Sequence, residues 1–149
     1  MIIILGYGNT LRGDDGIGVK IVQKLATMCL PNYIKIIDGG SRDTDVLLNT
    51  RDFEKLIIID SVISGGNEGN IYRMTIPELS ETKNMDLSTH GSYWIDFVKS
   101  KVESGEKNSW SQVVFFGIEI KNTAIGTELS PRIVDRIPEY LNFILKELQ

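Results

Sequence analysis

Acidic side chains and a histidine follow separate apolar segments of this chain. Asp14 and Asp15 lie after the apolar run at residues 2–5, and Asp60 directly ends a second such run. His90 is the only histidine among the 149 residues. Two carboxylates and one imidazole form a ligand set that suits a borderline divalent ion such as nickel or zinc. The same groups could instead polarise a water molecule and a peptide carbonyl directly.

The counts of histidine and cysteine limit the chemistry further. With one histidine, a two-histidine zinc motif is impossible, and a nucleophilic triad would have to use His90. Cys29 is the only cysteine, so the chain forms no internal disulfide and no cysteine-rich zinc cluster. We expect Cys29 to be a core residue on an apolar helix face. Any metal site must therefore depend on carboxylates.

Composition and charge exclude several classes of protein. The formal net charge is −4 and Lys and Arg form no cluster, so we expect no nucleic-acid partner. The apolar start, MIIIL, is too short for a signal peptide, and no segment is long enough for a membrane span. We therefore expect a cytoplasmic protein with no membrane partner. The length predicts one domain over residues 1–149, and we expect a monomer.

Apolar runs and helical periodicities alternate along the chain. Strands are predicted at residues 2–5, 33–38, 56–60, 71–76 and 113–120. Helices are predicted at residues 14–29, 43–50 (with Asp43 near the cap), 90–102, and from 131 on, where Ser130 is the N-cap and Pro131 takes N1. Pro138 is expected to kink or split the last helix. The fold class is therefore predicted as α/β, a three-layer α/β/α sandwich around a mostly parallel, twisted, five-stranded sheet.

One strand is expected to run against the others. The turn-rich stretch SGGNEGN, residues 64–70, predicts a hairpin that makes residues 71–76 antiparallel to the strand before them. Residues 77–88 must then return to the opposite edge of the sheet. When extended, these residues span about 40 Å, which is sufficient. The helix that follows His90 is thus expected to begin at the edge where the parallel strands end.

Polar groups from four segments are predicted to meet at this edge, because open α/β sheets bind ligands beyond the carboxyl ends of their strands. The groups are Asn9, Asp14 and Asp15, then Asp38, Gly39 and Gly40, then Asp60 and Ser61, and finally Ser88, Thr89 and His90. Each has an ordinary structural explanation as well. The paired aspartates could cap a helix, and Asp38 and Asp60 could cap turns.

A dinucleotide site is the strongest alternative for the first loop. The sequence GYGNTL with Asp38 has the outline of such a site. Leu11, however, stands where a glycine would let the helix approach the strand closely. Two carboxylates at the helix start would also repel a pyrophosphate. The sequence therefore disfavours phosphate binding at this loop.

Several motifs together resemble those of the maturation endopeptidases of nickel–iron hydrogenases. The motifs are GYGNTLRGDDGIG, IDGG, IIIDS and STH in this order, followed by GIEI and ELSP. The resemblance covers nearly the whole chain and implies a twisted, mostly parallel sheet between helices. It also implies that the protein trims a short C-terminal extension from a large-subunit precursor after nickel insertion. Ile120 departs from the pattern, since many members have proline there.

The resemblance also implies roles for individual residues. The metal-contacting and catalytic positions carry over to Asp15, Asp60 and His90, and in many members the first of these is glutamate. Nickel is implied as a part of the precursor, where it acts either as a Lewis acid or as a docking point. The expected substrate cleft comprises Gly6, Gly8, Asn9, Asp14, Asp38, Gly39 and Gly40. The alternatives are a nucleotide- or metal-binding module and a chaperone that holds the precursor without cutting it.

Overall fold

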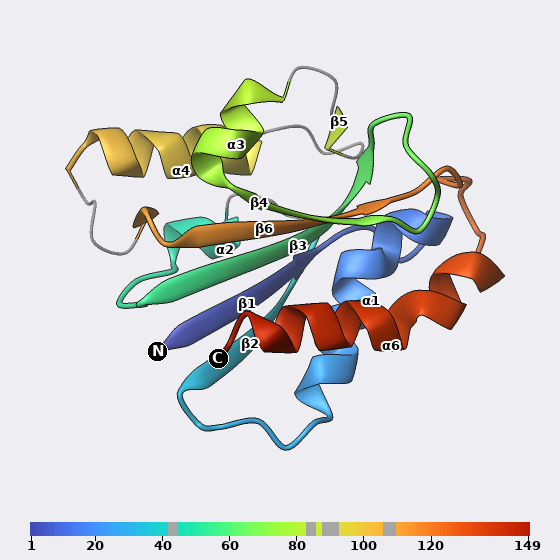
Figure 1. Ribbon diagram of the computed structural model, residues 1–149, viewed down its shortest axis with the longest axis horizontal. Helices are drawn as coiled ribbons and strands as arrows, with labels where there is room; N and C mark the ends of the chain where they lie inside the picture. The colour runs from blue at the N-terminus through green and yellow to red at the C-terminus, as the bar shows by residue number, and fades with distance from the viewer. Residues whose placement is uncertain (42–44, 83–85, 88–92, 106–109) are drawn as a thin grey trace.

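A mostly parallel sheet forms the centre of the molecule, with helices on both faces (Figure 1). The computed structural model describes residues 1–41, 45–82, 86–87, 93–105 and 110–149. The five main strands lie in the order β2-β1-β3-β6-β4. Their bounds are Ile2–Tyr7 (β1), Ile34–Gly40 (β2), Lys55–Ile63 (β3), Ile71–Thr75 (β4) and Val113–Glu119 (β6). β4 alone among these is antiparallel to its neighbour, so the predicted fold class is confirmed.

The helices divide into two layers. Their bounds are Gly13–Gly16 (the 3-10 helix η1), Ile17–Ala26 (α1), Asp45–Leu48 (α2), Ile76–Glu81 (α3), Tyr93–Glu103 (α4) and Pro131–Lys146 (α6). α1 and α6 cover one face of the sheet, whereas α2, α3 and α4 cover the other. No helix in the described part of the chain is long and apolar enough to cross a membrane.

The central strands supply side chains to both layers. Along β3, Ile57 and Ile59 pack with α1 and α6, and Ile58 packs with α2, α3 and α4. This alternation follows from the pleat of a strand, and it requires apolar residues at every position of a strand covered on both faces. The unbroken Leu-Ile runs of the sequence thus explain why β3 is an interior strand.

The predicted hairpin between β3 and β4 is wrong, although the antiparallel direction of β4 is right. β6 lies between these two strands and pairs with both. Every residue of β6 is buried, whereas β4 is only partly buried, so β6 takes the interior position and β4 the edge. Residues 64–70 pass over the end of β6, where Gly69 N–H donates to the Glu119 carbonyl. An additional two-residue strand, β5 (Asp86–Leu87), pairs with β3.

The helix predicted at residues 14–29 is shorter than expected. It begins at Ile17, after the 3-10 turn, and ends at Ala26. Cys29 therefore lies beyond the helix and is exposed, so the prediction of a core cysteine is wrong. The second predicted helix shrinks to the single turn of α2, and Asp43 lies outside the described residues.

Two proline-containing helices also differ from the prediction. α6 begins with Ser130 as N-cap and Pro131, as predicted, but continues through Pro138 as one helix. Pro138 is exposed, so the backbone hydrogen bond that it cannot donate lies on the solvent side of α6. The prediction that Pro138 splits this helix is therefore wrong. α3 was not predicted, although Thr75 and Glu78 form a capping box at its start.

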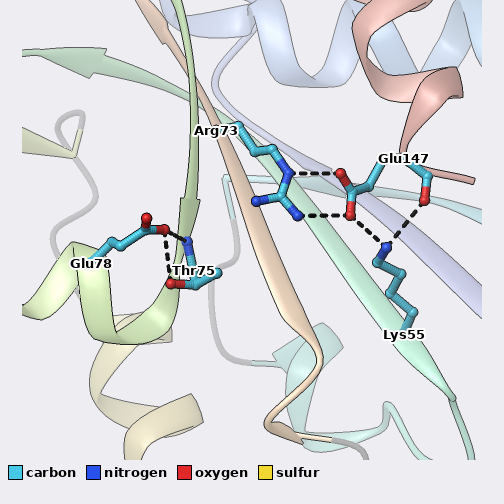
Figure 2. A network of polar contacts seen from close by, with 5 residues as sticks. All are labelled: Lys55, Arg73, Thr75, Glu78 and Glu147. Atoms are coloured by element: carbon cyan, nitrogen blue, oxygen red, sulfur yellow. Dashed lines mark hydrogen bonds and ion pairs between the residues drawn. The ribbon is translucent and has the colours of Figure 1, made fainter.

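The end of α6 is fixed to the sheet by an ion-pair network (Figure 2). Arg73 of β4 binds the Glu147 carboxylate with two nitrogens, at 2.7 and 2.9 Å. Lys55 of β3 donates to the same carboxylate and to the backbone carbonyl of Glu147. The hydrogen bonds from Arg73, followed by those from Lys55, lower the pKa of Glu147 to about 2. Figure 2 also shows the capping box, in which Thr75 donates to Glu78.

This network predicts a stability that depends on pH. The carboxyl group of Glu147 has a lower pKa in the folded chain than its ordinary value of 4.5, so its stabilisation is complete above that value. The stabilisation is lost as the pH falls toward 2. We expect Glu147→Gln to lower the free energy of unfolding by about 2 kcal/mol at pH 7 and by clearly less at pH 3. Urea unfolding at both values of pH measures this, and an equal loss at both would contradict it.

Candidate active site

The strand order places the switch point of the sheet between the carboxyl ends of β1 and β3, the position at which open α/β sheets form their ligand crevice. The chain leaves β1 through α1 to β2 on one side, and β3 lies on the other side of β1. Such a switch in direction is where open α/β sheets bind ligands. The pairing of β1 with β3 ends at Gly6 and Ile59, one residue before Asp60. β1 itself ends one residue later, at Tyr7, whereas β3 continues past Asp60 to Ile63.

Glycines allow the loop after β1 to pack directly onto these strand ends. A Cβ atom on Gly18 would lie 2.3 Å from the Tyr7 carbonyl oxygen and 2.5 Å from that of Ile59. Gly8 has a φ of +143°, and a Cβ there would lie 2.0 Å from the Asp15 carbonyl oxygen. The close approach of helix and strand, which seemed to need a glycine at Leu11, is thus made through Gly18.

Asp15 is buried in this crevice, with no exposed surface. Its Oδ2 accepts a hydrogen bond from the backbone N–H of Asn9 at 3.0 Å. Its Oδ1 accepts one from the hydroxyl of Ser61 at 3.1 Å. A buried carboxylate needs such donors to offset its lost hydration. Because Ser61 directly follows Asp60, this bond joins the segments that carry the two predicted acids.

Asp60 lies on the opposite face of β3 from Ser61 and is 3% exposed. Its Oδ1 accepts a hydrogen bond from the backbone N–H of Ser61 at 2.7 Å. Ser61 therefore contacts both carboxylates, one with its hydroxyl and the other with its amide. Two of the three predicted ligands, Asp15 and Asp60, thus each accept a hydrogen bond from Ser61, on opposite faces of β3.

The third predicted ligand, His90, lies outside the described residues, as do Ser88 and Thr89. The nearest described strand is β5, which pairs with Val62 and Ile63 of β3, just beyond Asp60. Within the described ranges, no three His, Cys, Asp or Glu side chains form a group that could hold a metal ion.

Asp14 is directed away from the crevice. Its Oδ1 accepts a hydrogen bond from the backbone N–H of Ser130 at 2.6 Å, and its Oδ2 binds the Ser130 hydroxyl. Ser130 precedes α6, so the carboxylate also faces the positive end of that helix. Asp14 thus has a structural role, which does not support its predicted place in the substrate cleft.

Asp38, Gly39 and Gly40 lie at the end of β2, on the other side of β1. Asp38 is exposed, and its carboxylate accepts hydrogen bonds from the Gly40 N–H at 3.0 Å and the Gln23 side chain at 3.3 Å. A cavity of about 470 Å³ lies between β2 and α2. Its lining includes Ile3, Lys35, Ile37, Asp38, Gly39, Asp45, Val46 and Arg51. The residues from α2 and Arg51 were not predicted, because no local pattern relates them to β2.

Comparison with known proteins identifies the family. Residues 19–147 match the model of a family described as hydrogenase maturation protease. The chain belongs to this family. A putative hydrogenase maturation protease of Methanocaldococcus jannaschii is 29% identical over 153 residues, which cover 99% of this chain and 96% of that protein. The hydrogenase 3 maturation protease of Escherichia coli K12 is 30% identical, with 78% of this chain and 71% of that protein covered.

A solved structure agrees with this assignment. The hydrogenase maturating endopeptidase HybD from Escherichia coli superposes with a TM-score of 0.83 and 26% identity. The superposition covers 99% of this chain and 91% of that one. The predicted family and the predicted enzyme class, a peptidase, are thus confirmed.

The position of Asp14 predicts a loss of stability without a role in chemistry. Asp14→Ala leaves the amide and hydroxyl of Ser130 without their acceptor, so we expect the free energy of unfolding to fall by about 2–3 kcal/mol. The matched control is Asp135→Ala, which removes an exposed carboxylate of α6 and should cost under about 0.5 kcal/mol. Urea unfolding compares the two variants. Equal losses in both would show that the contact with Ser130 is not important.

Proposed function

We propose that this protease removes a C-terminal extension from the large-subunit precursor of a nickel–iron hydrogenase after nickel has been inserted. Asp15, Asp60 and His90 would recognise the metal that the precursor carries by binding to it. The observation that supports this proposal is that Asp15 and Asp60 are both buried and both bind Ser61 at the switch point of the sheet.

The chemistry of these donors suits recognition of a metal held by another protein. Carboxylate oxygens and an imidazole nitrogen bind nickel, but three such groups without a thiolate make an open site of modest affinity. The precursor would supply the remaining ligands. The protease would then hold nickel only while the precursor is docked.

Metal recognition would contribute to catalysis by placing the scissile peptide. Fixing a bond next to reactive groups removes much of the entropic barrier to its cleavage. A carboxylate of the crevice would then act as the general base toward a water molecule. Asp38 and Gly39 line the cavity beside β2, and this cavity would offer room for the extension.

We also propose that the protein acts as a monomer in the cytoplasm. Its cysteine, Cys29, is exposed, and an exposed thiol is compatible with a reducing compartment.

The first test is the dependence of cleavage on nickel. Purified protein is incubated with nickel-loaded or nickel-free precursor, and the mass of the precursor is followed by mass spectrometry. We expect the extension to be released only from the nickel-loaded form. Equal release from both forms would refute metal recognition, and a stable complex of unchanged mass would indicate a chaperone instead.

The second test concerns two of the three proposed ligands, His90 and Asp60. His90→Ala and Asp60→Asn should each slow release from the nickel-loaded precursor by at least about 100-fold, because each removes a group that positions the reaction. The control is Asp96→Asn, which changes an exposed carboxylate of α4 and should keep the original rate. Circular dichroism checks that all variants are folded. Normal trimming by the His90 variant would remove that residue from the site.

A further inference from the structure

Glu119, at the end of β6, is a buried acid to which the proposed chemistry gives no role. Only 1% of its surface is exposed. Its Oε2 accepts a hydrogen bond from the Ser64 N–H at 2.8 Å, and its Oε1 accepts one from the Gly66 N–H at 2.7 Å. The hydroxyl groups of Ser64 and Tyr72 also donate to Oε1. One carboxylate thus binds both Ser64 and Gly66 in the loop that leaves β3.

The backbone of Glu119 holds the same loop. Its N–H donates to the carbonyl of Asn70, and its carbonyl accepts a hydrogen bond from the Gly69 N–H, both at 2.8 Å. A Cβ on Gly66 would lie 2.3 Å from the Tyr72 hydroxyl oxygen and 2.8 Å from Glu119 Oε1. The loop therefore packs on this side chain without room for a larger residue.

The hydrogen bonds require a carboxylate and not an amide. Both oxygens accept from backbone N–H groups, at Ser64 and at Gly66. A glutamine in place of Glu119 has the same shape but only one acceptor oxygen. Its NH2 group would have to face one of these two N–H donors. The loop would then lose a hydrogen bond at a buried position, whichever way the amide points.

The anchored loop follows directly from the part of β3 that carries the site. Glu119 is in register with Val62, two residues beyond Asp60. Val62 and Ile63 also pair with β5, which ends three residues before His90 in the sequence. Asp60 and β5 thus depend on how the end of β3 is held.

We propose that Glu119 is a positioning residue: it fixes the end of β3, and through it the orientation of Asp60 and of β5 at the switch point. This inference rests on the proposed function for its effect on catalysis. The side chain itself touches neither the metal nor the scissile peptide.

The test compares the same substitution at opposite edges of the sheet. Glu119→Gln disturbs the edge that carries Asp60, whereas Glu147→Gln disturbs the ion-pair network of Figure 2 at the other edge. Both are assayed on nickel-loaded and nickel-free precursor, well below their unfolding temperatures. We expect Glu119→Gln to lower kcat/KM on the nickel-loaded precursor by at least about tenfold and to reduce the preference for nickel. Glu147→Gln should change neither quantity.

Hydrogen exchange supplies a second measurement that does not depend on cleavage. In Glu119→Gln, amides of residues 60–66 and 86–87 should exchange at least about tenfold faster, whereas in Glu147→Gln they should not. If Glu119→Gln fails to fold, Ser64→Ala makes the same test, because it removes one donor and keeps the backbone bonds.

The outcomes separate the two proposals. Unchanged exchange and unchanged kcat/KM in Glu119→Gln would overturn the positioning role, and so would equal losses in both glutamine variants. If the unaltered protein itself fails to trim the precursor, the proposed function is wrong. The exchange data would then still decide whether Glu119 holds the end of β3.

Discussion

The close approach of α1 to the ends of β1 and β3 is the constraint on which the rest of the site depends. Gly18 lies so near the carbonyl groups of Tyr7 and Ile59 that no side chain fits there. This contact brings the turn before α1 over the end of β3, where Asp15 meets Ser61. If the helix stood farther away, Asp15 could not accept the hydrogen bond from Ser61 that links it to the segment of Asp60.

Four buried acids lie at or near the carboxyl edge of the sheet, and their partners divide them by role. Asp14 binds the start of α6, and Glu119 binds the loop after β3. The partners of both acids lie in connecting segments, one before α6 and the other between β3 and β4. Asp15 and Asp60, in contrast, share a single neighbour, Ser61, at the crevice itself. Acidic side chains thus hold the frame of the fold in two cases and are proposed metal ligands in the other two.

Local sequence patterns were sufficient for the main architecture. Unbroken apolar runs identified the interior strands, Ser130 and Pro131 identified the start of α6, and the family resemblance was confirmed by the match over residues 19–147. The insertion of β6 between β3 and β4 could not be read locally, because it depends on which of two apolar strands is buried more completely. The start of α3, in contrast, is encoded locally, by the capping box of Thr75 and Glu78.

The candidate site, like the fold, was predictable only where local patterns determine it. Strand ends converge by topology, so Asp15 and Asp60 could be expected at one edge. The direction of a carboxylate depends on partners remote in sequence, so local patterns indicate neither the bonds of Asp14 to Ser130 nor those of Glu119 to the loop after β3. The partner of Asp14 is 116 residues away, and that of Glu119 is 55 residues away. The placement of His90 stays a prediction.

The two chain ends lie side by side at the edge opposite the crevice (Figure 1). Consecutive residues hold them there: Glu54 binds the amino group of Met1, and Lys55 binds Glu147. A fusion partner or affinity tag joined after α6 would therefore extend away from Asp15 and Asp60. Met1, in contrast, lines the cavity beside β2, so a tag at the amino end would lie next to that cavity.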